Sequence, residues 1–409
     1  MFKNIRNRLL RFILIALTTI FGALILFYLL VYFACPSYSF REPKPFEGEY
    51  LYNPYQDMNP DLWKRYNFHC HSRKYLGITD GRHSTEKDID SMYQRMGYDH
   101  YGISDYMHIN RHRSDQPDYI PGYEHGYGLI RKTHQLCIGA EKVWRIDYPF
   151  VQNLSMKQNM LNQLGKRGRF AVPAHASFTM GYKVRDMKYL SNYRLLEVIN
   201  PFGFSFEHWD MALSNGHRVY IVGDDDTHNV LNPNEIGKCF TMINTADMTP
   251  EQVYSALENG NAYGVNFYIY YNEPFEVKVE NILQLPHLTR CELVGDTLFV
   301  ETSEIIEKAE FIGQDGKVLD TQENVHQAYY VIQPEDHYVR TNLQLPKQTF
   351  FYLNPITRHS TPVPVDERLD SINWFRTGFL WLVYAFMVFV IIRAIVKKPN
   401  TAKTHAASE

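Results

Sequence analysis

Two histidines flank one cysteine in the segment NFHCHS, residues 67–72, at the end of a run typical of a β-strand. Residues i and i+2 of a strand point to the same face. His69 and His71 can therefore reach one shared metal ion, while Cys70 points to the opposite face. We expect two imidazole ligands here and, at Cys70, a small buried core thiol.

Acids and histidines recur along the chain in the same kind of position. Between Tyr66 and Asn244, seven short apolar runs alternate with segments of helical periodicity: YNFHCHS, HYGISDY, LCIGAEK, RFAVPAHAS, LLEVINP, VYIVGDDDTH and CFTMIN. This alternation predicts βαβ units and a parallel sheet. In α/β barrels the carboxyl ends of the strands carry the chemistry. The polar residues near those ends are His69, His71, Asp105, Glu141, His175, Glu197, Asp226 and His228.

Strands that close into a barrel would bring these side chains into one small volume. Buried carboxylates and imidazoles repel one another or stay unsatisfied unless a cation joins them. A cluster of divalent metal ions resolves that problem, and mixed His and carboxylate ligands suit Zn, Mn or Fe.

Two of the intervening segments carry clear helix signals. In HSTEKDIDSMYQRMG, four apolar residues fall on one helix face after a cap at Ser84 or Thr85. In TPEQVYSALENG, we expect Thr249 to cap a helix, Gln252 to complete a capping box and Gly260 to end the helix.

The ordered motifs HCH, TDGRHSTEKDIDSMYQRMGYDHYGISD, GAEKV, VPAHAS, LEVIN and GDDDTH resemble the polymerase and histidinol phosphatase (PHP) domain, from about Asn67 to Val265. The resemblance implies a distorted seven-stranded (β/α)7 barrel over residues 66–266, with one to three divalent metals and phosphoesterase activity. Carried over one residue at a time, it implies the metal ligands His69, His71, Asp80, Glu141, His175, Asp226 and His228.

Within that set, Glu141 matches the bridging carboxylate, and we expect Glu141 and Asp226 to act in catalysis. Whether Asp226 ligates the metal or orients a neighbouring ring or water is left open by the sequence. Two groups near these ligands are candidates to meet the substrate phosphate, Arg82 and Lys142, although both also fit solvated loops. We expect three further residues to hold the ligands in place from outside the metal site: Asp105, Glu197 and Asn200.

The chain departs from the family pattern where the family usually has Thr-Asp-His. Here Ser104 and Asp105 are followed by Tyr106, so one histidine ligand is missing, and His108 is a candidate substitute. The segment KVWRIDYPF after Glu141 also lacks a histidine that many members have. One metal position, formed by His69, His71, Glu141 and Asp226, is complete, and the second and third are depleted.

After the barrel the pattern changes to alternation. The runs FEVKVEN, CELVGDTLFVETS, AEFIGQDGKVLDTQ, AYYVIQP, YVRTNLQL and TFFYLNPI predict a small antiparallel β-sandwich over residues 267–366. Arg340 would either reach toward the barrel or pack against it.

The two ends predict membrane spans. Residues 12–35 and 374–395 are apolar and long enough to cross a bilayer. Lys and Arg residues in the segments 1–11 and 396–409 place both ends in the cytoplasm by the positive-inside rule. The main domain, after a linker at residues 36–65, would then face the periplasm or the exterior of a two-pass inner-membrane protein.

Composition narrows the function classes. Of 409 residues 21% are charged, the net charge is −3 and there is no long basic run, which argues against nucleic acid as a partner. The sequence therefore favours a membrane-anchored phosphoesterase that acts on a phosphorylated small molecule or an envelope component. Two alternatives stay open: a non-catalytic binding or sensory module, which Tyr106 favours, and a hydrolase of non-phosphate bonds.

Overall fold

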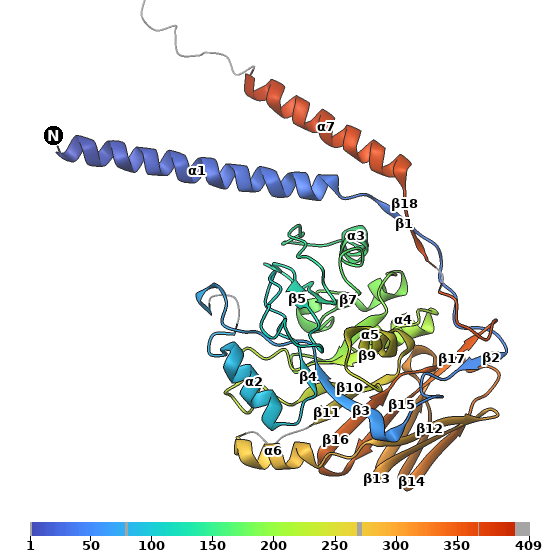
Figure 1. The fold of residues 1–409 in the computed structure, drawn as a ribbon. Coiled ribbons are helices and arrows are strands. Elements are labelled where there is room, and N and C mark those ends of the chain that lie inside the picture. Colours follow the sequence, from blue (N-terminus) through green and yellow to red (C-terminus); the bar gives the residue numbers. More distant parts are fainter. Residues whose placement is uncertain (1, 78–80, 268–271, 367, 397–409) are drawn as a thin grey trace, which may run out of the picture. The chain divides into compact units, whose positions relative to one another are not determined.

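The computed structural model describes residues 2–77, 81–267, 272–366 and 368–396 (Figure 1). The chain divides into two compact units. One holds residues 40–370, and the other holds the two terminal segments, 1–39 and 371–409.

The terminal unit consists mainly of two long apolar helices, α1 (Phe2–Ala34) and α7 (Trp374–Val396). The rings of Phe33 and Tyr384 stack at 4.4 Å between them. Both helices are long and apolar enough to cross a membrane, and the N-terminal one also fits a signal sequence. Near this unit the strands β1 (Tyr38–Phe40) and β18 (Asp370–Ile372) pair with each other.

Residues 40–370 form a mixed α/β unit with several sheets. Its first half contains the strands β2 (Tyr50–Tyr52), β3 (Trp63–Asn67), β4 (His100–Tyr101), β5 (Gly122–His125), β6 (Gln135–Ile138), β7 (Phe170–Pro173), β8 (Leu195–Ile199), β9 (Tyr220–Gly223) and β10 (Cys239–Asn244). Its α-helices there are α2 (Glu86–Arg95), α3 (Leu154–Leu164), α4 (Phe206–Ser214) and α5 (Pro250–Asn259). Each of the seven apolar runs holds a strand, and β5 lies outside all of them.

The directions of these strands differ from the predicted parallel sheet. β3 pairs in parallel with β4, and β8 pairs in parallel with β9. In contrast, β5, β6 and β7 form an antiparallel sheet, and β10 runs antiparallel to β3. The expectation of a parallel sheet is therefore correct only for two strand pairs.

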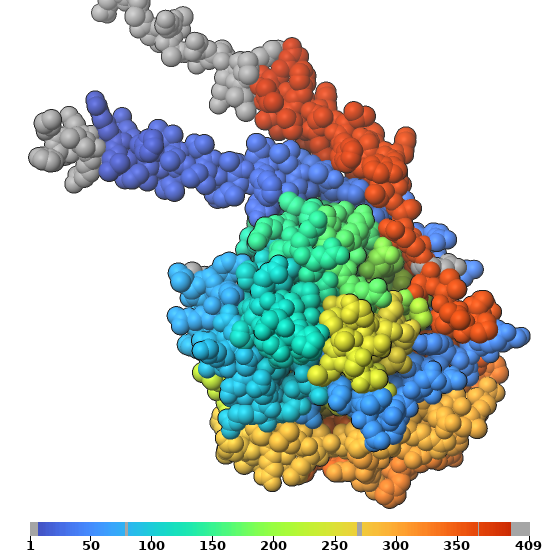
Figure 2. All heavy atoms as spheres, viewed as in Figure 1, coloured from blue at the N-terminus to red at the C-terminus, as the bar shows by residue number. Residues whose placement is uncertain are grey.

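The second half contains β11 (Ala262–Phe267), α6 (Phe275–Leu283), β12 (Leu288–Val294), β13 (Thr297–Ile312), β14 (Val318–Val331), β15 (Tyr338–Leu345), β16 (Thr349–Leu353) and β17 (Ile356–His359). Its strands are antiparallel, and β16 pairs with β11, which pairs with β10. One sheet thus joins both halves, and Figure 2 shows the yellow-to-orange residues packed against the cyan and green ones. The predicted boundary at residue 266 stays a prediction.

Two local expectations in this unit are wrong. The run FEVKVEN, predicted to be a strand, is helix α6. Its residues Phe275, Val279 and Ile282 pack on the core at helical spacing, although alternate residues are also apolar. The capping box at α5 is the other error, because the Thr249 hydroxyl donates to Asp247 instead.

Other local signals agree with the structure. Thr85 caps α2 in a capping box with Asp88, and Gly260 ends α5 in a left-handed conformation with φ 78°. Arg340 of β15 is buried and pairs with Asp210 of α4, with Nε 2.7 Å from Oδ1 and Nη2 2.8 Å from Oδ2. This ion pair fixes the C-terminal strands to a helix of the first half.

Candidate metal centre

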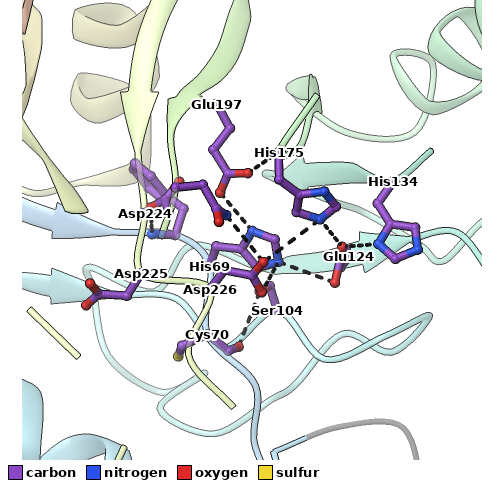
Figure 3. A network of polar contacts seen from close by, with 12 residues as sticks. His69, Cys70, Ser104, Glu124, His134, His175, Glu197, Asp224, Asp225 and Asp226 are labelled. Atoms are coloured by element: carbon purple, nitrogen blue, oxygen red, sulfur yellow. Dashed lines mark hydrogen bonds and ion pairs between the residues drawn. The ribbon is translucent and has the colours of Figure 1, made fainter. Parts of the chain in front are cut away.

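Four side chains from three separate parts of the chain meet in the interior of the larger unit (Figure 3). His69 and His71 follow β3, Glu124 lies on β5, and Asp226 follows β9. All four are buried, with side-chain exposures between 0% and 4%.

Backbone pairing places the two histidines beside the aspartate. The segment at Cys70 forms a parallel bridge with Thr227. The backbone N–H of Asp226 donates to the His69 carbonyl at 2.8 Å, and that of His71 donates to the Thr227 carbonyl at 2.9 Å. Asp226 has φ 47°, an unusual backbone conformation that turns its carboxylate toward the histidines.

Glu124 is held in a similar way. Its N–H donates to the Ser104 carbonyl at 3.0 Å, and its carbonyl accepts the N–H of Met107 at 2.8 Å. As predicted, Cys70 points away: it is buried in an apolar cluster, and its thiol lies 3.3 Å from the Gly102 carbonyl (Figure 3).

In this group, each histidine nitrogen lies at nearly the same distance from both carboxylate oxygens. His69 Nε2 lies 3.3 Å from Glu124 Oε2 and 3.3 Å from Asp226 Oδ1. His71 Nε2 lies 3.2 Å from Glu124 Oε2 and 3.3 Å from Asp226 Oδ1. In a site with bonds of about 2.0 Å, neighbouring ligand atoms of a tetrahedral ion lie about 3.3 Å apart. These four separations, with all four atoms within 4.8 Å of one another, fit the ligands of a single cation.

The hydrogen bonding of these atoms supports the same interpretation. His69 Nε2, Glu124 Oε2 and Asp226 Oδ1 are buried and make no hydrogen bond within the part of the chain that the structure describes. Buried polar atoms without partners cost free energy, and a cation at their centre would satisfy all of them.

The second oxygen of Glu124 belongs to a second group. Oε1 lies 2.5 Å from His134 Nδ1 and 3.0 Å from His175 Nε2. His134 directly precedes β6, and His175 follows β7. Glu124 can therefore bridge two cations, one on each oxygen, although the two histidines could also simply donate hydrogen bonds to it.

Two outer residues orient these ligands. Glu197 of β8 accepts from His69 Nδ1 at 2.9 Å through one oxygen and from the His175 backbone N–H at 2.5 Å through the other. With its Nδ1 proton on Glu197, His69 presents the Nε2 lone pair to the centre. Asn200 donates to Asp226 Oδ2 at 3.3 Å, which leaves Oδ1 for the centre.

Without a cation, the ionisable side chains of the cluster shift one another's pKa values. Burial lowers the pKa of His69, but Asp226, Glu197 and Glu124 outweigh it and hold that pKa well above its ordinary value. Burial raises the pKa of Glu124, yet His134 and His69 hold it well below its ordinary value. Both shifts favour a proton on His69, whose positive charge would stand in the place of a cation.

We expect metal binding to displace that proton. Calorimetric titration of chelator-treated protein with Zn²⁺ at pH 7, in buffers of different ionisation enthalpy, should show proton release. The apparent affinity should rise by about tenfold per pH unit for each proton released, up to the raised pKa of His69. Binding heats that are independent of the buffer would contradict this assignment.

The same shift sets the pH dependence of the metal-free fold. A histidine pKa raised by folding contributes stability that is fully present below the unfolded value near 6.5 and is lost as pH rises through the folded value. The chelator-treated protein should thus become less stable on the alkaline side of neutrality.

Replacing Glu197 by glutamine should weaken metal binding by about 10- to 100-fold, the usual effect of removing an outer partner of a ligating histidine. The glutamine amide has only one oxygen, so its NH2 group must face either His69 Nδ1 or the His175 N–H, and one of the two hydrogen bonds is lost. Glu207→Gln, an exposed position on α4, is the matched control. Equal metal affinity in both variants would show that Glu197 does not orient His69.

Of the predicted ligands, the structure brings together His69, His71, Asp226 and His175, but it does not place Glu141 with them. Glu141 is exposed in the turn after β6, and Glu124 of β5 is the acid that both groups of ligands contain. The reason is the direction of β6, which runs antiparallel to β5 and β7. Its four residues span roughly 13 Å, so His134 at its start faces the cluster and Glu141 lies beyond its far end.

Lys142 is also exposed and, like Glu141, lies beyond the far end of β6. Arg82 is exposed as well, and Asp80 lies outside the described residues. His108 belongs to neither of the two groups found among the described residues. Asp105 accepts from the Ser72 N–H at 2.7 Å and so anchors the residue after His71.

His228 lies at the edge of the cluster. Its ring stacks on His71 with a centroid separation of 4.3 Å, and its Nδ1 lies 3.9 Å from Asp226 Oδ1. Tyr106, at the missing histidine, stacks on His71 at 4.6 Å.

Two residues of the cluster, Glu124 and His134, are not among the ligands predicted from the sequence. A signal for β5 exists in PGYEHG, where Tyr123 and His125 alternate with Glu124 between glycines. His134 lies ten residues after Glu124, directly before β6, and belongs to the second group.

No protein-family model and no curated protein matches the chain. One solved structure is similar, the crystal structure of a two-domain protein from Bacteroides vulgatus that contains a predicted PHP-like metal-dependent phosphoesterase. It has a TM-score of 0.38 and 12% sequence identity, and the match covers 78% of this chain and 100% of that chain. A likeness this distant says nothing about the activity of this chain.

Proposed function

We propose that this chain is a metal-dependent hydrolase that cleaves phosphate esters. The observation that carries the proposal is the group of four buried ligand atoms, in which each histidine nitrogen lies 3.2–3.3 Å from both carboxylate oxygens, a spacing that fits one shared cation. The PHP motifs supply the reaction class and, with it, the barrel and the C-terminal β-sandwich as the proposed architecture.

His69, His71, Glu124 and Asp226 would hold one cation, and Glu124 would share a second with His134 and His175. Bound Zn, Mn or Fe ions would supply Lewis acidity and a water that ionises near neutral pH. Glu124, rather than Glu141, would be the bridging acid.

The remaining groups would prepare the site for the substrate. Glu197 fixes the tautomer of His69, and Asn200 fixes the carboxylate of Asp226. His228 lies at the more open side, with a side chain that is 34% exposed. It is placed to contact a phosphate oxygen or to join a further cation.

The location is part of the proposal. The two apolar helices would anchor the chain in the inner membrane, with residues 40–370 on the periplasmic or exterior side. A phosphorylated small molecule or envelope component would then be the substrate.

The test uses the full chain in lipid nanodiscs. Elemental analysis should find one to three transition-metal ions per chain, and loading with Mn, Zn or Fe should support hydrolysis of an aryl phosphate mono- or diester. Glu124→Gln should lose both properties, and Glu141→Gln should keep them. Bound metal with neither ester cleaved under any of the three metals would contradict the proposal.

One observation favours a second candidate function. Tyr106 covers a face of His71 at 4.6 Å, in the position where the family places a ligand. A binding or sensory module would hold metal and bind phosphate esters without turnover. An aryl acetate is tested in parallel. Metal-dependent cleavage of the acetate would indicate a hydrolase of non-phosphate bonds, whereas a binding or sensory module would leave the acetate intact.

A further inference from the structure

The metal cluster is buried except on one side, where it is more accessible to solvent. Its four ligands are at most 4% exposed, whereas the side chain of His228 is 34% exposed. A substrate would therefore meet the cluster from the side of His228.

Aromatic side chains line this edge in an unbroken series. The ring centroids of His175 and Phe178 lie 5.8 Å apart, and those of Phe178 and Phe202 lie 5.4 Å apart. Phe202 in turn lies 6.2 Å from the ring of His228, edge to face at 85°. Two phenylalanines thus connect a residue of the second group to the residue at the opening, and Phe202 is half exposed.

Exposed aliphatic side chains lie in the segment after Phe178 and in a neighbouring loop. Met180, two residues after Phe178, is 64% exposed. The loop that leads into His134 crosses the same segment, because Lys132 N–H donates to Thr179 Oγ1 at 2.8 Å. That loop exposes Leu129 and Ile130 at 68% and 62%. We call Phe178, Met180, Phe202, Leu129 and Ile130 the apolar rim.

The chemistry of the apolar rim indicates one kind of ligand. Exposing large apolar side chains to water is unfavourable, and several on adjacent loops mark a binding surface. Phenylalanine, leucine and isoleucine have no side-chain hydrogen-bond donor or acceptor, so they cannot hydrogen-bond to a nucleobase or to the hydroxyls of a sugar. Phenylalanine rings also stack on nucleobases, but leucine, isoleucine and methionine favour hydrocarbon. They match methylene groups.

Resting on the proposed function, we propose that the substrate is the phosphate ester of an aliphatic amphiphile. Its phosphate would lie at the metal cluster, and its hydrocarbon chain would lie along the apolar rim. The two apolar terminal helices, as membrane spans, would keep the chain where such amphiphiles are found.

The test is a chain-length series with the full protein in lipid nanodiscs. Alkyl phosphate monoesters from methyl to hexyl are compared by kcat/KM under saturating metal. Each methylene buried on the rim should raise kcat/KM by about three- to fourfold. Phe202→Ala and, separately, Leu129→Ser should reduce this slope. Val318→Ala, an exposed position on β14, controls for partitioning into the bilayer and should keep the slope.

Two results would overturn the inference while the proposed function stands. One is metal-dependent cleavage of methyl and hexyl phosphate with equal kcat/KM. The other is faster cleavage of adenosine monophosphate or glucose phosphate than of hexyl phosphate. If no phosphate ester of any kind is cleaved, the proposed function fails and this inference fails with it.

Discussion

Replacing Glu124 by glutamine is expected to remove metal from both groups of ligands and to lower hydrolysis by more than about 100-fold. Changes in outer partners of metal ligands already cost about 10- to 100-fold, and Glu124 is the one acid shared by both groups. Glutamine keeps the size of the side chain but loses the charge and offers only one oxygen. Elemental analysis and the rate of aryl phosphate hydrolysis measure the two effects.

Glu141→Gln is the matched control, because the same change is made at the residue that the sequence motif indicates. Glu141 is exposed beyond the far end of β6, so this variant should bind metal and turn over like the wild type. The opposite pattern, with loss at Glu141 and none at Glu124, would show that the cluster is not the functional site.

Replacing Asp225 by alanine is expected to lower the free energy of unfolding by about 3–5 kcal/mol. Its buried carboxylate accepts three backbone N–H groups, at 2.7 Å from Gly237, 2.7 Å from Lys238 and 3.1 Å from Cys239. The Tyr93 hydroxyl donates to it as well, at 3.2 Å. Each buried donor left without an acceptor costs about 1–3 kcal/mol, reduced where water enters.

Thermal unfolding of the full chain measures this loss. Asp225→Asn retains one carbonyl oxygen and should lose about half as much stability. Asp296→Ala, at an exposed turn, should change stability by less than about 0.5 kcal/mol. An Asp225→Ala variant as stable as the control would mean that the loop from β9 to β10 does not depend on this carboxylate.

The predictable part of the site follows from strand geometry. The period of two along a strand places His69 and His71 on one face, and their contacts with Asp226 agree with that. Asp226 and His175 come after strands whose ends do face the cluster.

The unpredictable part is strand direction. An apolar run looks the same whether its strand runs toward the site or away from it, so the sequence of β6 could not show that His134, rather than Glu141, faces the cluster. β5, which carries Glu124, has only four residues, so the alternation in PGYEHG is a short signal that is easily overlooked. The alternating apolar residues of α6 gave a strand pattern because helix and strand periods overlap in short segments.

The pairing of β2 with β17 has a consequence for biosynthesis. Tyr52 lies opposite Thr357, so the first of these strands leaves the ribosome long before its partner is made. At roughly 5–20 residues per second, the delay is about 15–60 s. During that interval the exposed edge of β2 is open to pairing with other chains. A chaperone that covers β2 in this interval would favour its correct pairing with β17. A ribosome that stalls before residue 359 would release a chain in which β2 lacks its complete partner strand.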